Sequence, residues 1–172
     1  MSNLIGMHKE PEHWNDSVIS DLISELENFP KRLSDFIGNS SEDKLNTKTS
    51  PNVWTVRQII HHLADSHMNA FIRTKLALTE DVPIIKPYKD NLWGDFPDAN
   101  KAPVQESLLI LKSLHSRWCL TLRSLNDEQW KKEFYHPERK RKVNMLANLS
   151  LYAWHGKHHM AYIEELYTKN NW

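Results

Sequence analysis

The sequence predicts an all-α protein, a four-helix bundle that forms a single domain over residues 1–172. The 172 residues include only four glycines, and they contain neither a low-complexity segment nor a repeat of fixed period. Apolar residues recur at helical spacing in four long stretches, and one long connection separates the second stretch from the third. Four such helices with one crossover are typical of a bundle that builds its site between facing helices.

The first helix is predicted over residues 17–36. Gly38 is expected to close it, and Pro30 is expected to break or kink it, because proline has no backbone N–H to donate. The apolar residues that recur at helical spacing are Val18, Leu22, Ile23, Leu26, Phe29, Leu33 and Phe36.

The second helix has a clear start signal in Thr55-Val56-Arg57-Gln58. This pattern predicts a capping box, in which the Thr55 and Gln58 side chains each accept a hydrogen bond from the other residue's backbone N–H. The helix should then run to about Thr79, before the first prolines of the next segment. The third and fourth helices are predicted over residues 104–125 and 144–167.

The connection over residues 80–103 is long for a compact domain and contains four prolines. Connections of this length are often functional. Because it carries Tyr88, Trp93 and Phe96, we expect a packed lid. The shorter polar segment 127–142 is interpreted as a plain connection between the last two helices.

The charge composition gives no sign of a nucleic-acid partner, because Lys and Arg number 22 and Asp and Glu also number 22. The basic run 139–142 is interpreted as a solvated loop. No apolar run approaches the roughly 18 residues of a membrane span, and the polar residues 1–14 do not resemble a secretory signal. The single Cys119 fits a reducing compartment. We therefore expect a cytoplasmic protein without a membrane or nucleic-acid partner.

The run Trp154-His155-Gly156-Lys157-His158-His159 places two histidines four residues apart in the last predicted helix. Positions i and i+4 lie on one face, so the His155 and His159 rings can reach one ion at a Zn–N distance of about 2.0–2.1 Å. Both border the apolar stripe of this helix, whereas His158 is expected to be exposed. Gly156 lies within the stripe, where close approach of another backbone would explain it. The spacing alone also fits two surface histidines.

The second helix can supply a third nitrogen from His61-His62-Leu63-Ala64-Asp65-Ser66-His67. Its helical wheel leaves two candidates open: His62 borders the core on a polar row that could line a cleft, whereas His67 lies within the apolar stripe. His61 is expected to point away. Asp65 could support His62 or could simply be a solvated acid. The polar row consists of Gln58, His62, Asp65, Ser66, Asn69 and Arg73; His115 and His136 are interpreted as surface or core-edge residues.

Several motifs at consistent spacing together resemble the DinB superfamily, and most closely its YfiT-like branch of candidate metal-dependent hydrolases. The resemblance covers roughly residues 51–166. It implies a four-helix bundle with a long crossover between the second and third helices, a homodimer, and one divalent metal ion per subunit held by His62, His155 and His159. The motifs are Trp54 to Gln58, His61 to Asn69, Lys86 to Tyr88, Leu114 to Trp118, His136 to Glu138, and Tyr152 to His159.

Three histidines that leave a coordination position open are typical of a catalytic metal site, where a water can reach a pKa near 7. We therefore predict a hydrolase acting on a small molecule, with zinc as the first candidate ion and nickel as the second. Gly156 stands where metalloproteases of the His-Glu-x-x-His type carry their general base, so a base must come from Asp65, from the long loop or from the metal-bound hydroxide itself. Two alternatives stay open: a transferase that uses a low-molecular-weight thiol, which a metal also deprotonates, and a non-catalytic metal-binding stress protein.

Overall fold

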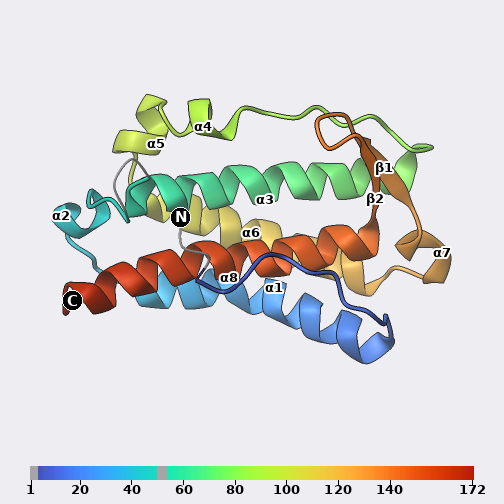
Figure 1. The fold of residues 1–172 in the computed structure, drawn as a ribbon, viewed down its shortest axis with the longest axis horizontal. Helices are drawn as coiled ribbons and strands as arrows, with labels where there is room; N and C mark the ends of the chain where they lie inside the picture. Colours follow the sequence, from blue (N-terminus) through green and yellow to red (C-terminus); the bar gives the residue numbers. More distant parts are fainter. Residues whose placement is uncertain (1–3, 50–53) are drawn as a thin grey trace.

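Four long helices lie side by side in the computed structural model, which describes residues 4–49 and 54–172 (Figure 1). They are α1 (Asp16–Ile37), α3 (Val56–Thr79), α6 (Val104–Arg123) and α8 (Met145–Lys169). Helices α1 and α3 each pack against both α6 and α8. Although α1 and α3 are consecutive long helices in the sequence, they therefore lie at opposite corners of the bundle. Helices α3 and α6 run in the same direction, which requires a crossover along the bundle (Figure 1). The predicted four-helix bundle with a long crossover is confirmed.

The capping box at the start of α3 is also confirmed. The Gln58 N–H donates to Thr55 Oγ1 at 3.2 Å, and the Thr55 N–H donates to Gln58 Oε1 at 2.9 Å. Helix α1 begins in a related way, with the Asn15 side chain accepting from the Val18 N–H. These contacts satisfy backbone donors that would otherwise have no partner in the first turn.

Pro30 does not break α1, which continues through it to Ile37. Proline removes one helical hydrogen bond, but Phe29 and Leu33 on either side are buried in the core and hold both halves of the helix in place. The helix ends where predicted. Gly38 adopts a positive φ of 47° and its N–H donates to the Ser34 carbonyl, a conformation that glycine adopts without the penalty of a side chain.

The crossover contains two short helices, α4 (Asp90–Trp93) and α5 (Pro97–Lys101), and runs back along α3 (Figure 1). Its Ile85 and Ala99 side chains are buried, and polar side chains of α3 bind its backbone. The Gln58 amide donates to the Gly94 carbonyl at 2.8 Å, and Arg57 donates to the Ala102 carbonyl at 2.6 Å. The aromatic residues contribute less than expected, since Phe96 remains 55% exposed.

The segment over residues 127–142 is not a plain connection. It forms the short helix α7 (Asp127–Trp130) and an antiparallel hairpin of β1 (Glu133–His136) and β2 (Arg141–Asn144). Strand β1 also binds the crossover, because the Tyr135 N–H donates to the Pro83 carbonyl and the Ile85 N–H donates to the Tyr135 carbonyl. The hairpin covers the end of the bundle where α8 begins (Figure 1). A further short helix, α2 (Glu42–Leu45), precedes α3.

The core has two apolar clusters with a layer of histidines between them. One cluster includes Phe29 and Leu63, and the other includes Trp118 and Tyr152. The His67 ring stacks on Phe29 with centroids 5.9 Å apart and meets Tyr152 edge-on at 5.1 Å. None of the described helices combines the length and apolar character that crossing a membrane requires.

Gly156 is explained by the Phe29 ring of α1 and not by a neighbouring backbone, as the sequence had suggested. A Cβ at position 156 would lie 2.9 Å from Phe29 Cδ2. We expect Gly156→Ala to lower the free energy of unfolding by up to about 2 kcal/mol, because overpacking costs about 1–3 kcal/mol and better helix propensity returns about 1 kcal/mol. Urea unfolding measures this. The loss should shrink in a Phe29→Leu background, and an equal loss in both backgrounds would show that the ring is not responsible.

Candidate metal centre

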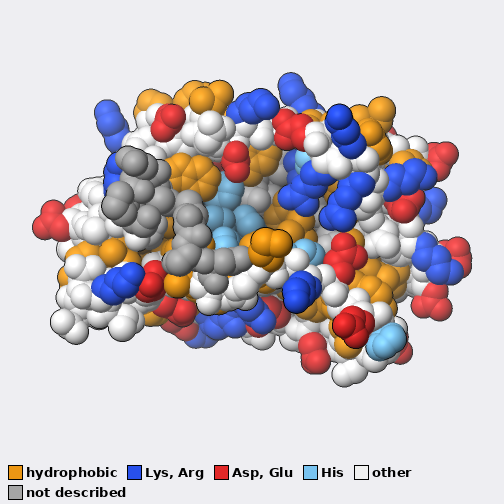
Figure 2. All heavy atoms as spheres, in the orientation of Figure 1, with side chains coloured by type: hydrophobic (Ala, Val, Ile, Leu, Met, Phe, Trp, Pro, Cys, Tyr) orange, Lys and Arg blue, Asp and Glu red, His pale blue; other side chains and the backbone are white. Residues whose placement is uncertain are grey.

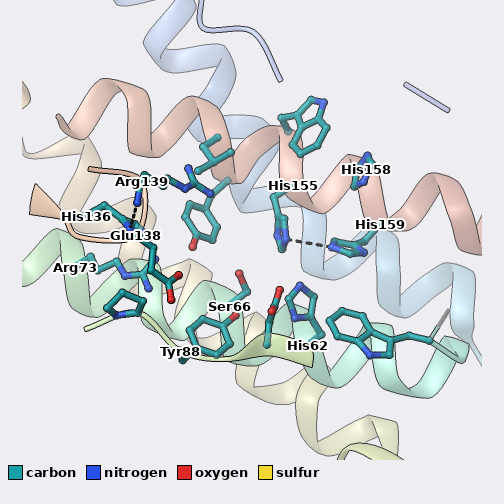
Figure 3. Close-up of a pocket in the computed structure, with 16 residues that line it drawn as sticks. His62, Ser66, Arg73, Tyr88, His136, Glu138, Arg139, His155, His158 and His159 are labelled. Atoms are coloured by element: carbon teal, nitrogen blue, oxygen red, sulfur yellow. Dashed lines mark hydrogen bonds between the residues drawn. The ribbon is translucent and has the colours of Figure 1, made fainter. Parts of the chain in front are cut away.

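Three histidine rings from two helices converge on one point. His62 comes from α3, and His155 and His159 come from successive turns of α8 (Figure 3). One ring nitrogen from each lies within 4.8 Å of the other two, and the Nε2 atoms of His155 and His159 are 3.1 Å apart. Two nitrogens bound to one tetrahedral zinc ion at about 2.0–2.1 Å are separated by about 3.3 Å. The donor set therefore fits a single divalent cation.

Burial keeps these rings neutral. It lowers the pKa of His62 to about 4 and the pKa values of His155 and His159 well below their ordinary range. The neighbouring imidazoles lower the last two further. A histidine must be unprotonated to bind a metal, so all three rings have a lone pair available at neutral pH.

A chain of buried hydrogen bonds runs from His155 into the core. His155 Nδ1 is 3.2 Å from His67 Nε2, His67 Nδ1 is 2.9 Å from His115 Nε2, and His115 Nδ1 is 2.5 Å from the Leu26 carbonyl oxygen. We call His155, His67 and His115 the histidine chain.

The carbonyl at its end determines where every proton of the histidine chain lies. A carbonyl oxygen can only accept, so His115 donates from Nδ1 and its neutral ring accepts at Nε2. His67 must then donate from Nδ1 and accept at Nε2, and His155 must donate from Nδ1. The Nε2 atom of His155, which faces His159, is left with its lone pair. The fold therefore leaves the His155 Nε2 lone pair facing His159, an arrangement that supporting hydrogen bonds commonly produce in metal-binding histidines.

The structure also places the other histidines. His67, the second candidate on α3, is buried behind His155 and is not one of the three converging rings. His115 is only 1% exposed. It is therefore a core residue, and its interpretation as a surface or core-edge residue is wrong. The sequence did contain a signal, because position 115 shares helical spacing with Leu111, Trp118 and Leu122. His61, expected to point away, is buried against Ser107 of α6.

Asp65 makes no side-chain hydrogen bond to a histidine within residues 4–49 and 54–172, and it does not line the cavity described below. Burial and the charge of Asp98 raise its pKa to about 6. His158 is half-buried and not exposed as expected, because its ring stacks on Trp154 at 4.3 Å. His136, on β1, is buried at the opposite end of the same cavity.

A cavity of about 600 Å³ opens onto the three converging rings. Figure 2 shows histidine side chains at the floor of a hollow on this face, with Lys and Arg side chains gathered toward one side. Between its two ends the cavity is walled mainly by aromatic and apolar side chains. These are Trp54, Pro87, Tyr88, Leu151, Tyr152 and Trp154. The volume and lining are typical of a pocket for a small molecule.

We expect the metal-free protein to lose stability as the pH falls from 7 toward 4. The unfolded chain takes up protons near pH 6.5, whereas the pKa values of folded His62 and His115 are lowered to about 4 by burial. The unfolded state then binds more protons, so stability declines through this window. A pKa lowered from 6.5 to about 4 corresponds to roughly 3 kcal/mol for each histidine.

Asp65 has the opposite effect on stability. Because its pKa is raised in the folded state, the folded state binds a proton at a higher pH than the unfolded state does, and this stabilises the fold as the pH falls. The net loss by pH 4.5 should still be roughly 3 kcal/mol or more. Urea unfolding in the presence of a chelator measures it, and Asp65→Asn should make the decline steeper. A free energy of unfolding that stayed constant between pH 7 and pH 5 would contradict the burial of neutral histidines.

Comparison with known proteins gives consistent matches over nearly the whole chain. The DinB superfamily model matches residues 25–163. A relative from Oceanobacillus iheyensis, named as a candidate metal-dependent hydrolase, is 43% identical over 155 residues, covering 90% of this chain and 89% of its own length. A Bacillus cereus relative with the same designation is 46% identical over 168 residues, covering 98% and 96%.

The solved structure of YfiT from Bacillus subtilis, described as a probable metal-dependent hydrolase with an unusual four-helix bundle topology, matches with a TM-score of 0.96. The identity is 41%, and the match covers 99% of this chain and 98% of YfiT. Sequence identity and three-dimensional agreement of this extent show common family membership. The chain belongs to the DinB superfamily, in its YfiT-like branch.

Proposed function

We propose that this chain is a metal-dependent hydrolase that acts on a small molecule, with one divalent cation held by His62, His155 and His159. Zinc is the first candidate and nickel the second, since imidazole ligands suit both. The observation that carries the proposal is the convergence of three neutral ring nitrogens at the floor of an open cavity. The names of the relatives from Bacillus and Oceanobacillus agree with it.

A cation bound there would supply Lewis-acid activation of water or of a substrate carbonyl. The residues around the cavity would have separate roles in the reaction. His67 holds His155 in the tautomer that presents Nε2. Tyr88 lines the cavity, and burial raises the pKa of its hydroxyl above the ordinary value, so it stays protonated and can donate to a substrate oxygen.

The general base is best sought in the crossover. Position 156 cannot supply it, because Gly156 faces the Phe29 ring. Asp65 does not line the cavity, whereas Asp90 does, and the negative charge of Asp90 acts on His62. We therefore assign the base to Asp90, the carboxylate of the crossover that lines the cavity and acts on His62.

A transferase that uses a low-molecular-weight thiol is the second candidate. A cation lowers the pKa of a bound thiol, so this reaction needs no neighbouring carboxylate. Among the described residues the converging group consists of histidines alone. A non-catalytic metal-binding module is disfavoured by a cavity of about 600 Å³ at the rings.

The metal-loaded protein should be incubated with panels of esters, amides and electrophiles, with and without small thiols. The hydrolase proposal predicts turnover without a thiol that is lost in His155→Ala and at least tenfold lower in Asp90→Asn. Turnover that requires a thiol would reject the hydrolase in favour of the transferase. We also propose that the protein works in the cytoplasm as a homodimer; a sedimentation mass of one chain at micromolar concentration would contradict the dimer.

A further inference from the structure

Arg73 is buried at the cavity and has no hydrogen-bond or ion-pair partner among the described residues. It lies on α3, three turns after His62 and on the same face, and it lines the cavity beside His136 and Arg139 (Figure 3). Only 8% of its surface is exposed. Within the described residues, no hydrogen bond or ion pair reaches its guanidinium.

The other buried arginine of α3 shows what a structural arginine requires here. Arg57 donates to Asn46 Oδ1 at 3.1 Å, to the Ala102 carbonyl at 2.6 Å and to Glu42 Oε2 at 2.5 Å. A buried charge without such acceptors is costly. No nitrogen of Arg73 is among the fully enclosed polar atoms of the described residues that lack a partner, so the guanidinium faces the open cavity and its acceptor is the solvent or a ligand there.

The other charged groups leave this end of the cavity positive. Arg139 lines it, and burial together with Arg73 and Arg139 lowers the pKa of His136. Two carboxylates also line the cavity. Glu138 is paired with Lys89 Nζ at 3.1 Å, and the charge of Asp90 acts on His62 at the opposite end. Glu138 is thus the one carboxylate at this end, beside the positive charges of Arg73, Arg139 and Lys89 (Figure 3).

The two ends of the cavity are well separated. Eleven residues of α-helix span about 16 Å, although both side chains lean into the space between. The walls along this path include Tyr88, Leu151 and Tyr152, which suit an apolar or planar middle section. A molecule that reaches both ends is elongated and carries different chemistry at each end.

We propose that Arg73, assisted by Arg139, binds an anionic group of the substrate, a carboxylate or a phosphate, while the reacting group lies at His62, His155 and His159. The substrate class is a small, elongated anion. Its reacting end rests on the proposed function, whereas the anionic end depends only on Arg73 and its surroundings.

The test uses hydroxamates, which bind an open metal site, with an anionic or a neutral tail. The probes are suberic acid monohydroxamate, its isosteric terminal amide, and the analogue with a terminal phosphonate. Calorimetry gives the affinity for the metal-loaded protein, and the visible spectrum of the cobalt-loaded protein reports contact with the metal. The carboxylate or the phosphonate should bind about 10- to 100-fold more tightly than the amide, and the tighter of the two identifies the anion.

Arg73→Met should remove most of this preference and leave the affinity for the amide within about threefold, which also shows that the variant folds. Arg141→Met, at an exposed arginine of β2 outside the cavity, is the matched control and should keep the preference. Equal binding of the anionic and neutral probes to the wild type would overturn the anion site while keeping the metal centre. An anion preference without any spectral change would keep the anion site and contradict the open coordination position.

Discussion

Replacing His155 by alanine should lower the affinity for a divalent cation more than about 100-fold, and replacing His62 or His159 should do the same. Loss of a residue that merely supports a metal ligand typically costs 10- to 100-fold, so loss of one of only three ligands must cost more. Calorimetric titration with zinc measures the affinity, and elemental analysis of dialysed protein measures the zinc content. We expect one ion per chain in the wild type and less than that in each of the three variants.

His158→Ala is the matched control, because it removes an imidazole from the same turn of α8 whose ring stacks on Trp154. It should keep the metal. Wild-type protein that retained no more zinc than His155→Ala would show that the converging rings do not form the site. Loss of the ion in His67→Ala but not in His62→Ala would instead reassign the third ligand.

Breaking the histidine chain should weaken the metal site without abolishing it. His67→Phe removes the acceptor for the His155 Nδ1–H, which lies 3.2 Å away. We expect the zinc affinity to fall about 10- to 100-fold while the stoichiometry at saturation stays at one ion per chain. His115→Phe should have a smaller effect on affinity, but it leaves the buried His67 Nδ1–H unpartnered and should cost about 1–3 kcal/mol of stability.

Nitrogen-15 NMR of the metal-free protein shows directly which ring nitrogens of the histidine chain carry a proton. The proton on His155 should reside on Nδ1 and exchange slowly with solvent, and the Nε2 atom should show the shift of an unprotonated nitrogen. His67→Phe should increase the exchange rate of this proton. A proton on His155 Nε2 in the wild type, or a zinc affinity unchanged within twofold in His67→Phe, would contradict the assigned tautomer.

Local signals in the sequence predicted the bundle well. The Thr55 capping box and the apolar spacing of the four helices are determined by neighbouring residues, and the structure has them at nearly the predicted positions. The hairpin was missed because each strand has only four residues, with Phe134, Tyr135 and Val143 as the apolar ones. That pattern is too short to reveal a strand, and its pairing with Pro83 of the crossover is a tertiary contact that no local pattern contains.

In the candidate site, too, local sequence patterns predicted some features, and contacts between distant segments determined the rest. Spacing alone indicated that His155 and His159 share a face, but it could not choose between His62 and His67, because the choice depends on how α3 is rotated against α8. The importance of His115 and Arg73 depends on contacts between distant segments as well. His115 is identified by the Leu26 carbonyl of α1, and Arg73 by the absence of an acceptor within the described residues.

Anomalous diffraction at the zinc edge, from crystals of the zinc-loaded protein, tests the metal centre most directly. The predicted result is one peak per chain at about 2.0–2.1 Å from a ring nitrogen of each of His62, His155 and His159, with solvent in the remaining position. A peak elsewhere in the molecule, or a further side chain occupying that last position, would contradict a catalytic metal site.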